Sequence, residues 1–162
     1  MLPIGTVLAV VFGALPFCGN SSANALERAG IPGIWITDRN DGEVEIKPCG
    51  DRLCGYVYSI NYPNPIHPGE PLPDGYNENP KLRSRLLCGI QVMGDLRKQP
   101  DGSWTDGWGY DPKMGKTYSI ELRLQEPNVL AIFGYLGVKL LGKTVLYTRS
   151  KGEWKQCSTK RQ

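Results

Sequence analysis

Short strand-like segments separated by turn residues dominate the chain from residue 33 onward, and no long segment repeats apolar residues every 3.6 positions. Glu43–Lys47 alternates strictly, with Val44 and Ile46 on one face, as in a strand with one dry side. Asp41-Gly42 before it is a hairpin signal, which places Trp35 beside Val44. Strands are therefore predicted at Gly33–Thr37, Glu43–Lys47, Leu53–Ile60, Leu86–Met93, Ser103–Tyr110, Lys116–Leu124, Val129–Tyr135 and Leu141–Arg149.

Eight strands joined mostly by short turns favour an all-β fold, namely a single eight-stranded antiparallel up-and-down barrel. A β-sandwich is the alternative. A barrel of this size is either filled by its own side chains or holds one small ligand. Asn61–Pro80 is rich in proline, which removes donors from a sheet, so we expect a long loop at one barrel end that covers or gates the mouth. A single helical turn is predicted to begin at Pro80.

The first 17 residues are uncharged and almost wholly apolar, and Ala23-Asn24-Ala25 has the form of a signal-peptidase cleavage site. We therefore predict that residues 1–25 are a cleaved signal peptide and that 26–162 form one domain, located in the periplasm or secreted. A membrane anchor is the alternative. The apolar run is shorter than the roughly 20 residues that a span needs, and Pro16 interrupts it, so no membrane span is expected in the mature protein.

Four cysteines remain after such cleavage, because Cys18 is removed with the leader, and Phe17 before it does not suit a lipoprotein signal. An even number in an exported protein favours disulfides, and three pairings are possible. The remaining cysteines are Cys49, Cys54, Cys88 and Cys157. A tight turn favours Cys49–Cys54, which leaves Cys88–Cys157 to tie the C-terminal tail to the barrel. A zinc site is the alternative, but paired Cys-x-x-Cys motifs are absent from the sequence.

Charge and the single histidine narrow the function classes. The formal net charge is only +3, with both signs mixed along the chain, so nucleic acid is not an expected partner. His67 is the only histidine and lies in the Pro-rich segment, so neither a His-rich metal site nor His-based catalysis is expected. The sequence also contains no Asp-rich calcium loop. No nucleophile–base pair can be recognised, so the protein is predicted to be non-enzymatic, without metal or cofactor. The oligomeric state is left open.

Aromatic side chains are frequent, and they either line a cavity or fill the core. The candidate ligand-binding rings are Tyr56, Tyr58, Trp104, Trp108, Tyr110, Tyr118, Phe133 and Tyr135. Alternation in Ser103–Tyr110 places Trp104, Asp106, Trp108 and Tyr110 on one face of a strand. If that face points inward, Asp106 is a buried carboxylate that needs a partner; if it points outward, Asp106 is an ordinary solvated residue. Arg83, Asp106 and Tyr118 are the candidates to orient a ligand through polar contacts.

Several motifs are spread in order over nearly the whole chain after residue 30. They are Gly33-Ile34-Trp35, Cys49-Gly50-Asp51-Arg52-Leu53-Cys54-Gly55, Asn79-Pro80, Arg85-Leu86-Leu87 with Gly89, Trp104 with Gly107, Tyr110-Asp111-Pro112, Gly115-Lys116-Thr117-Tyr118, Gly134-Tyr135, Leu141-Gly142-Lys143 and Thr148-Arg149. Together they resemble a bacterial exported family catalogued as domain of unknown function 2147. The resemblance implies a lipocalin-like or calycin-like barrel, export, and no established reaction.

Gly33 and Trp35 in the first strand, with Arg149 in the last, also resemble the lipocalin pattern of Gly-x-Trp followed much later by a basic residue that packs on the tryptophan. This resemblance implies a structural role for the three residues. The function it implies is the binding of one small hydrophobic or amphipathic molecule inside the barrel. The alternative is an interaction or structural module of the cell envelope, with a filled barrel and a functional outer surface.

Overall fold

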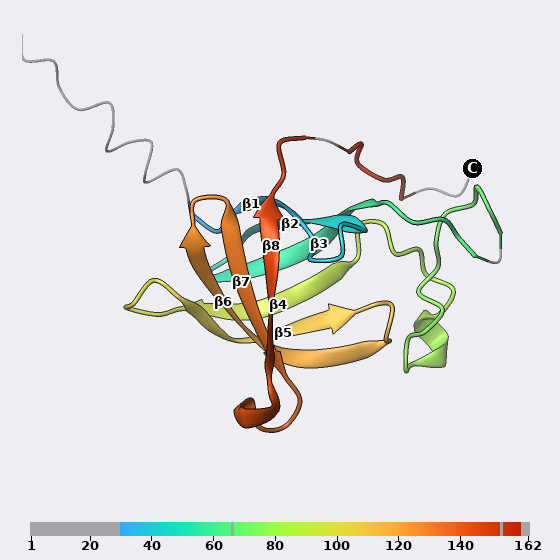
Figure 1. Cartoon of the computed structure of the whole chain (residues 1–162). Helices are drawn as coiled ribbons and strands as arrows, with labels where there is room; N and C mark the ends of the chain where they lie inside the picture. Colours follow the sequence, from blue (N-terminus) through green and yellow to red (C-terminus); the bar gives the residue numbers. More distant parts are fainter. Residues whose placement is uncertain (1–29, 66, 153, 160–162) are drawn as a thin grey trace, which may run out of the picture.

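The computed structural model describes residues 30–65, 67–152 and 154–159, and its strands close into one antiparallel barrel (Figure 1). The strands are β1 (Gly33–Ile36), β2 (Gly42–Cys49), β3 (Arg52–Ile60), β4 (Gln91–Lys98), β5 (Trp104–Asp111), β6 (Lys116–Glu126), β7 (Val129–Tyr135) and β8 (Lys143–Arg149). Each strand pairs with its sequence neighbours, and β1 also pairs with β8. The barrel prediction is confirmed, and the sandwich alternative is wrong. The predicted signal peptide lies outside the described residues.

The fourth strand begins later than the sequence predicts. We expected Leu86–Met93, but β4 runs from Gln91 to Lys98. The apolar residues before it pair with the Pro-rich segment instead: Leu86 forms a bridge with Pro73, and the Leu87 amide donates to the Leu72 carbonyl at 2.9 Å. These residues therefore hold the long segment in place and are not part of a barrel strand.

The barrel has two different ends. Since consecutive strands are antiparallel, the connections β1–β2, β3–β4, β5–β6 and β7–β8 share one end, which we call the open end. The chain enters β1 and leaves β8 at the opposite, closed end. Large side chains that are almost completely buried fill the closed half, and they are Trp35, Ile46, Leu53, Leu96, Leu122 and Leu130. This packing removes apolar surface from water and so stabilises the fold.

Trp35 is held at the closed end by the residues that the lipocalin pattern indicates. It pairs with Arg149 in the β1–β8 register, and the guanidinium lies 4.2 Å from the centre of the indole ring. Arg149 also donates to the carbonyls of Gly30 and Pro32, while the Trp35 indole N–H donates to the Ile31 carbonyl at 2.8 Å. A Cβ on Gly33 would lie 2.6 Å from Arg149 Nη1, so only glycine leaves room for this arrangement.

A buried carboxylate fastens the long segment between β3 and β4 to the barrel. Asp74 is inaccessible to solvent and accepts hydrogen bonds from Arg85 at 2.9 Å, from Asn77 at 2.7 Å and from the Tyr110 hydroxyl at 2.5 Å. The segment also contains a 3₁₀ turn, η1 (Pro80–Leu82), where the sequence predicts a helical turn. These three hydrogen bonds offset the cost of burying the Asp74 carboxylate. The long segment is therefore fixed to the barrel by specific contacts.

Two disulfides are formed, Cys49–Cys54 in the β2–β3 turn and Cys88–Cys157 between the long segment and the C-terminal tail. The tail leaves β8 at the top of the view and runs across the barrel toward the long segment (Figure 1). The Cys157 amide donates to the Tyr58 carbonyl at 2.9 Å, so β3 also holds the tail.

Candidate functional site: the barrel cavity

A cavity of about 570 Å³ lies in the open half of the barrel. Strands β2 to β8 all contribute to its wall. The apolar lining includes Val44, Val57, Ile60, Leu87, Val92, Met93, Ile120, Ile132 and Val145. Gly134 on β7 faces the same space: a Cβ there would meet only Ile120 and Tyr118, at 3.9 and 4.0 Å. Glycine and valine at inward positions therefore leave space that larger side chains would fill.

Four tyrosines add polar groups to this lining: Tyr62, Tyr110, Tyr118 and Tyr147. Burial raises the pKa of Tyr62 to about 12, helped by the negative charges of Asp41 and Asp111. Burial also raises the pKa of Tyr147, whose ring lies deep in the barrel yet faces the cavity and so keeps some accessible surface. Both phenols stay protonated at neutral pH. No residue in the described ranges hydrogen-bonds the hydroxyl of Tyr147, which leaves it available as a donor.

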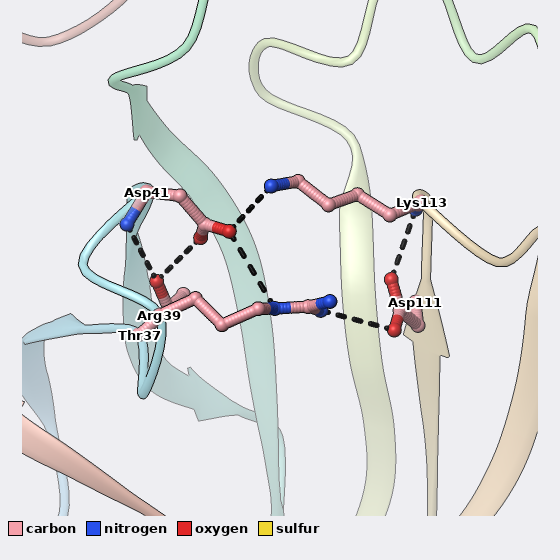
Figure 2. Close-up of polar contacts among 5 residues, drawn as sticks. All are labelled: Thr37, Arg39, Asp41, Asp111 and Lys113. Carbon is pink, nitrogen blue, oxygen red and sulfur yellow. Dashed lines mark hydrogen bonds and ion pairs between the residues drawn. The ribbon is translucent and has the colours of Figure 1, made fainter.

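Two hairpin tips meet across the mouth through a set of charged side chains (Figure 2). Arg39 and Asp41 come from the β1–β2 connection, while Asp111 and Lys113 come from the end of β5 and its turn. Lys113 Nζ lies 2.5 Å from Asp41, and Arg39 lies 3.1 Å from Asp111 and 3.5 Å from Asp41. Thr37 donates to Asp41 at 2.7 Å. We call Arg39, Asp41, Asp111 and Lys113 the mouth bridge.

The mouth bridge sets the protonation of its own members. Burial alone would raise the pKa of Asp41, but hydrogen bonds from Lys113 and Thr37 outweigh it, so the pKa is lowered. Burial likewise acts against the Arg39 charge, but Asp111 and Asp41 outweigh it and raise the pKa of Arg39. Lys113 also lies 4.0 Å above the centre of the Tyr62 ring. The mouth is thus charged, internally paired and closed on one side by an aromatic ring.

Two further charges and one buried acid complete the polar lining. Asp38 and Lys143 line the cavity, and neither forms an ion pair with another residue in the part of the chain that the structure describes. Glu43 on β2 is almost fully buried and accepts hydrogen bonds from the hydroxyls of Ser59 and Ser150. The cavity therefore combines an aliphatic floor with a polar mouth. Such a site fits an amphipathic molecule better than a purely polar one.

Of the residues predicted to contact a ligand, only Tyr110 and Tyr118 line the cavity. The Tyr110 hydroxyl donates a hydrogen bond to Asp74 and accepts one from Asn77. Burial and the hydrogen bond to Asp74 raise the pKa of Tyr110. Trp104 packs against the core cluster. The structure places the remaining candidates away from the cavity lining; they are Tyr56, Tyr58, Arg83, Asp106, Trp108, Phe133 and Tyr135.

The contacts of these remaining candidates explain their placement. Lys47 lies over the Tyr56 ring, and the Trp108 indole donates to Asp95 at 3.0 Å in an exposed position. Phe133 and Tyr135 pack on each other, with ring centres 5.7 Å apart, on the side of β7 that is covered by the β7–β8 connection and its 3₁₀ turn, η2 (Lys139–Leu141). Arg83 donates to the Asn77 carbonyl at 2.8 Å and so serves the long segment.

A bulge in β5 explains why Trp104, Asp106, Trp108 and Tyr110 do not share one face of the strand, as simple alternation predicts. The register shifts between Trp104 and Gly107, and Asp106 within this shift adopts a φ of 59°. The extra residue turns Asp106 to solvent and places Gly107 and Gly109 on the inner side after it. The outward alternative for Asp106 is therefore the one observed. Simple alternation cannot predict a bulge, although a run containing two glycines is one of its signals.

Sequence reasoning missed Tyr62, Tyr147 and the whole mouth bridge. Tyr147 lies two residues after Val145 in β8, and alternate residues of a strand share one face. The alternation in this strand therefore predicts that Tyr147 points inward with Val145. The mouth bridge had no such signal, because Asp41 and Lys113 are 72 residues apart and meet only when the barrel closes.

The described residues contain no cluster of His, Cys, Asp and Glu suited to a metal ion. Within the same residues, no helix is both long and apolar enough to traverse a bilayer.

Comparison with known proteins agrees with this architecture. The family model described as "Uncharacterized protein conserved in bacteria (DUF2147)" matches residues 33–149, from the start of β1 to the end of β8. The chain is also similar to a solved structure titled "Protein HP1028 from the human pathogen Helicobacter pylori belongs to the lipocalin family". The identity is 26% and the TM-score 0.63, over 76% of this chain and 84% of that chain. A search of curated proteins finds no match. The lipocalin-like fold is thereby confirmed.

Proposed function

The chain belongs to the DUF2147 family of bacterial proteins, and on that premise we propose that it is an exported, non-enzymatic protein that binds one small amphipathic molecule in its barrel. The observation that carries the proposal is the cavity of about 570 Å³ with an aliphatic wall and a polar mouth. Ligand sites commonly occupy roughly 300–1,000 Å³ and are mostly apolar with a few placed polar groups.

The ligand's apolar part would lie against the valine and isoleucine wall, where burial stabilises it by about 25 cal/mol per Å² of apolar surface. Its polar group would lie near Tyr147, Asp38 and Lys143, whose side chains have no competing ion pair or hydrogen bond among the described residues. The mouth bridge contains two acids and two bases and so adds no net charge. The ligand class supported best is therefore an acyl chain or fused apolar ring with one small polar head.

A cavity-filling variant tests this proposal. Gly134→Leu places a side chain into the open space, and Thr144→Leu adds the same side chain at an exposed position of the neighbouring strand. The probe is N-phenyl-1-naphthylamine, whose fluorescence rises in apolar surroundings. We expect saturable binding at one site, weakened about tenfold or more by Gly134→Leu, since the added side chain takes part of the ligand's space.

Thr144→Leu is expected to bind the probe as the original chain does. Equal binding by Gly134→Leu, with its fold verified by circular dichroism, would place the probe outside the cavity and overturn the proposal. Native mass spectrometry of the protein purified from exporting cells adds a second measurement. A stoichiometric mass that is lost on denaturation would name the ligand class directly.

A further inference from the structure

The connection between β7 and β8 holds four apolar side chains in solvent at the open end of the barrel. Leu136 is 51% exposed, Val138 57%, Leu140 93% and Leu141 78%. The connection contains a 3₁₀ turn, η2 (Lys139–Leu141), and projects from the barrel at the bottom of the view (Figure 1). Of the other strongly exposed apolar residues in the described part, Tyr76 and Met114 also belong to open-end connections.

Specific contacts hold this connection in its outward position. Lys139 forms an ion pair with Glu121 of β6, and its Nζ lies 5.7 Å from the centre of the Tyr135 ring. Gly142 passes so close to Phe133 that a Cβ there would lie 2.2 Å from the ring. Phe133 and Tyr135 are thus used as a base for the connection. Packing on Phe133 and Tyr135 thus holds the connection in a position that exposes its leucines to solvent. Such an exposed apolar patch indicates a surface that another molecule covers.

The loop itself carries two lysines and no acid, and Lys139 is already paired with Glu121 of the neighbouring β6, so among the described residues Lys143 supplies its unpaired positive charge. No acidic residue occurs between Glu126 and Glu153, while Lys139 and Lys143 flank the two leucines. Lys143 forms no ion pair with any residue in the described ranges, and it lies on the rim of the cavity. Apolar side chains beside lysines are the arrangement by which peripheral proteins enter an anionic lipid surface.

We propose that residues 136–143 form a lipid-docking loop that inserts into the surface of an anionic membrane. A lipid surface fits better than a protein partner, because the exposed side chains form a projecting tip and not a broad face. Val145 and Lys143 connect the loop directly to the cavity wall. Docking would therefore hold the mouth close to the lipid. This goes beyond the binding of a ligand in the cavity and does not depend on it.

Vesicle sedimentation tests the proposal. The protein is purified from exporting cells, its N terminus is defined by mass, and it is mixed with vesicles of phosphatidylethanolamine and phosphatidylglycerol or of phosphatidylcholine alone. We expect binding to the anionic vesicles, weakened about tenfold or more by Leu140→Ser/Leu141→Ser, because burial of two leucines supplies most of the apolar contact. Lys143→Gln should weaken binding about fivefold at low salt, corresponding to about 1 kcal/mol per lysine. Leu146→Ser on the barrel wall, where the leucine is 48% exposed, is the matched control and should bind normally.

The proposal would be overturned if the protein bound neither kind of vesicle, or if Leu140→Ser/Leu141→Ser bound the anionic vesicles as tightly as the original chain. A concentration-dependent dimer that this variant abolishes would also overturn it, since a second copy would then cover the loop. Both serine substitutions lie in exposed positions, and an unchanged melting temperature verifies the fold. The cavity is assayed separately in the same samples with N-phenyl-1-naphthylamine, so that loss of docking and loss of ligand binding are distinguished.

Discussion

At the scale of single residues, the closed end depends on one glycine. Gly33 has a φ of 145°, and the space where its Cβ would be is occupied by Arg149. Gly33→Ala should both strain the backbone and displace the guanidinium from Trp35. We expect a loss of about 2–4 kcal/mol in the free energy of unfolding, summed from the strain and the cation–π contact. Urea unfolding followed by tryptophan fluorescence measures this loss.

Gly102→Ala is the matched control for Gly33→Ala, because Gly102 also has a positive φ but nothing lies within 4 Å of its Cβ position. It should lose only the backbone contribution, about 1–2 kcal/mol. Equal losses in the two variants would show that the Arg149 contact contributes nothing to stability.

The phenol of Tyr62 predicts a change of stability with pH. Its folded pKa is about 12 against an ordinary value of 10.0, so the unfolded chain releases this proton first as pH rises. The contribution of Tyr62 to stability is therefore complete below pH 10 and is lost as pH rises from 10 toward 12. Unfolding free energies at pH 9 and pH 11 should fall less steeply for Tyr62→Phe than for the original chain.

The same direction holds for Tyr110 and Tyr147, so part of the alkaline loss should remain in Tyr62→Phe. Tyr76→Phe, which removes a phenol that is 70% exposed, is the control for the loss of one tyrosine hydroxyl. A Tyr62→Phe slope as steep as the original would contradict the assignment of a buried phenol at the mouth.

The residues that sequence alone could predict are those with a fixed motif. Gly33, Trp35 and Arg149 were indicated by type, spacing and order, and the structure brings them into contact. The aromatic rings were harder, because type alone does not say which side of a strand a ring occupies. One residue in the left-handed region, Asp106, changes the side of every residue that follows it in β5.

At the scale of elements, seven strands lie close to their predicted positions, and β4 does not. A buried strand is recognised by its apolar residues, and Leu86 and Leu87 supply apolar residues from outside the barrel strands. The true β4 has the exposed residues Asp95 and Arg97 on either side of the buried Leu96, and so looks less apolar. Pairing with β3 and β5 determines its position, and such pairing is a long-range property that local sequence does not contain.

The mouth bridge joins two hairpins from opposite parts of the barrel sequence and predicts a measurable coupling. A double-mutant cycle with Asp41→Asn and Lys113→Met should give a coupling of about 0.5–1 kcal/mol, because both side chains are only partly exposed. The coupling should decrease in about 1 M salt, where the Debye length falls to roughly 3 Å. Chemical unfolding of the four proteins measures it.

The matched control for the mouth bridge is the pair Arg123–Asp101, with N···O at 2.6 Å but side chains 63% and 54% exposed. Its cycle with Arg123→Met and Asp101→Asn should give a coupling near zero. A mouth coupling no larger than this control would mean that the two hairpins are not held together by charge. The tips would then be free to separate without an electrostatic cost.

At the scale of the whole molecule, the C-terminal tail connects regions that the barrel itself leaves independent. Ser150 donates to the buried Glu43 of β2, and Cys157 is linked to Cys88 in the long segment between β3 and β4. The tail therefore fastens the long segment, whose other anchor is Asp74 against Tyr110 on β5. Through these two anchors the long segment is kept beside the mouth, where Tyr62 and Leu87 reach the cavity.

The two disulfides should therefore differ in their contribution to stability. Cys88 and Cys157 are 69 residues apart, while Cys49 and Cys54 are 5 apart. In the chain-entropy model the longer closure contributes about 4 kcal/mol and the shorter about 2 kcal/mol. We expect Cys88→Ser/Cys157→Ser to lower the free energy of unfolding about twice as much as Cys49→Ser/Cys54→Ser, measured by urea unfolding without reductant. The first variant should also make residues 61–90 the earliest site of proteolysis, because the tail no longer holds them. A larger loss from the short turn would show that local geometry, and not closure of the tail, is what the disulfides supply.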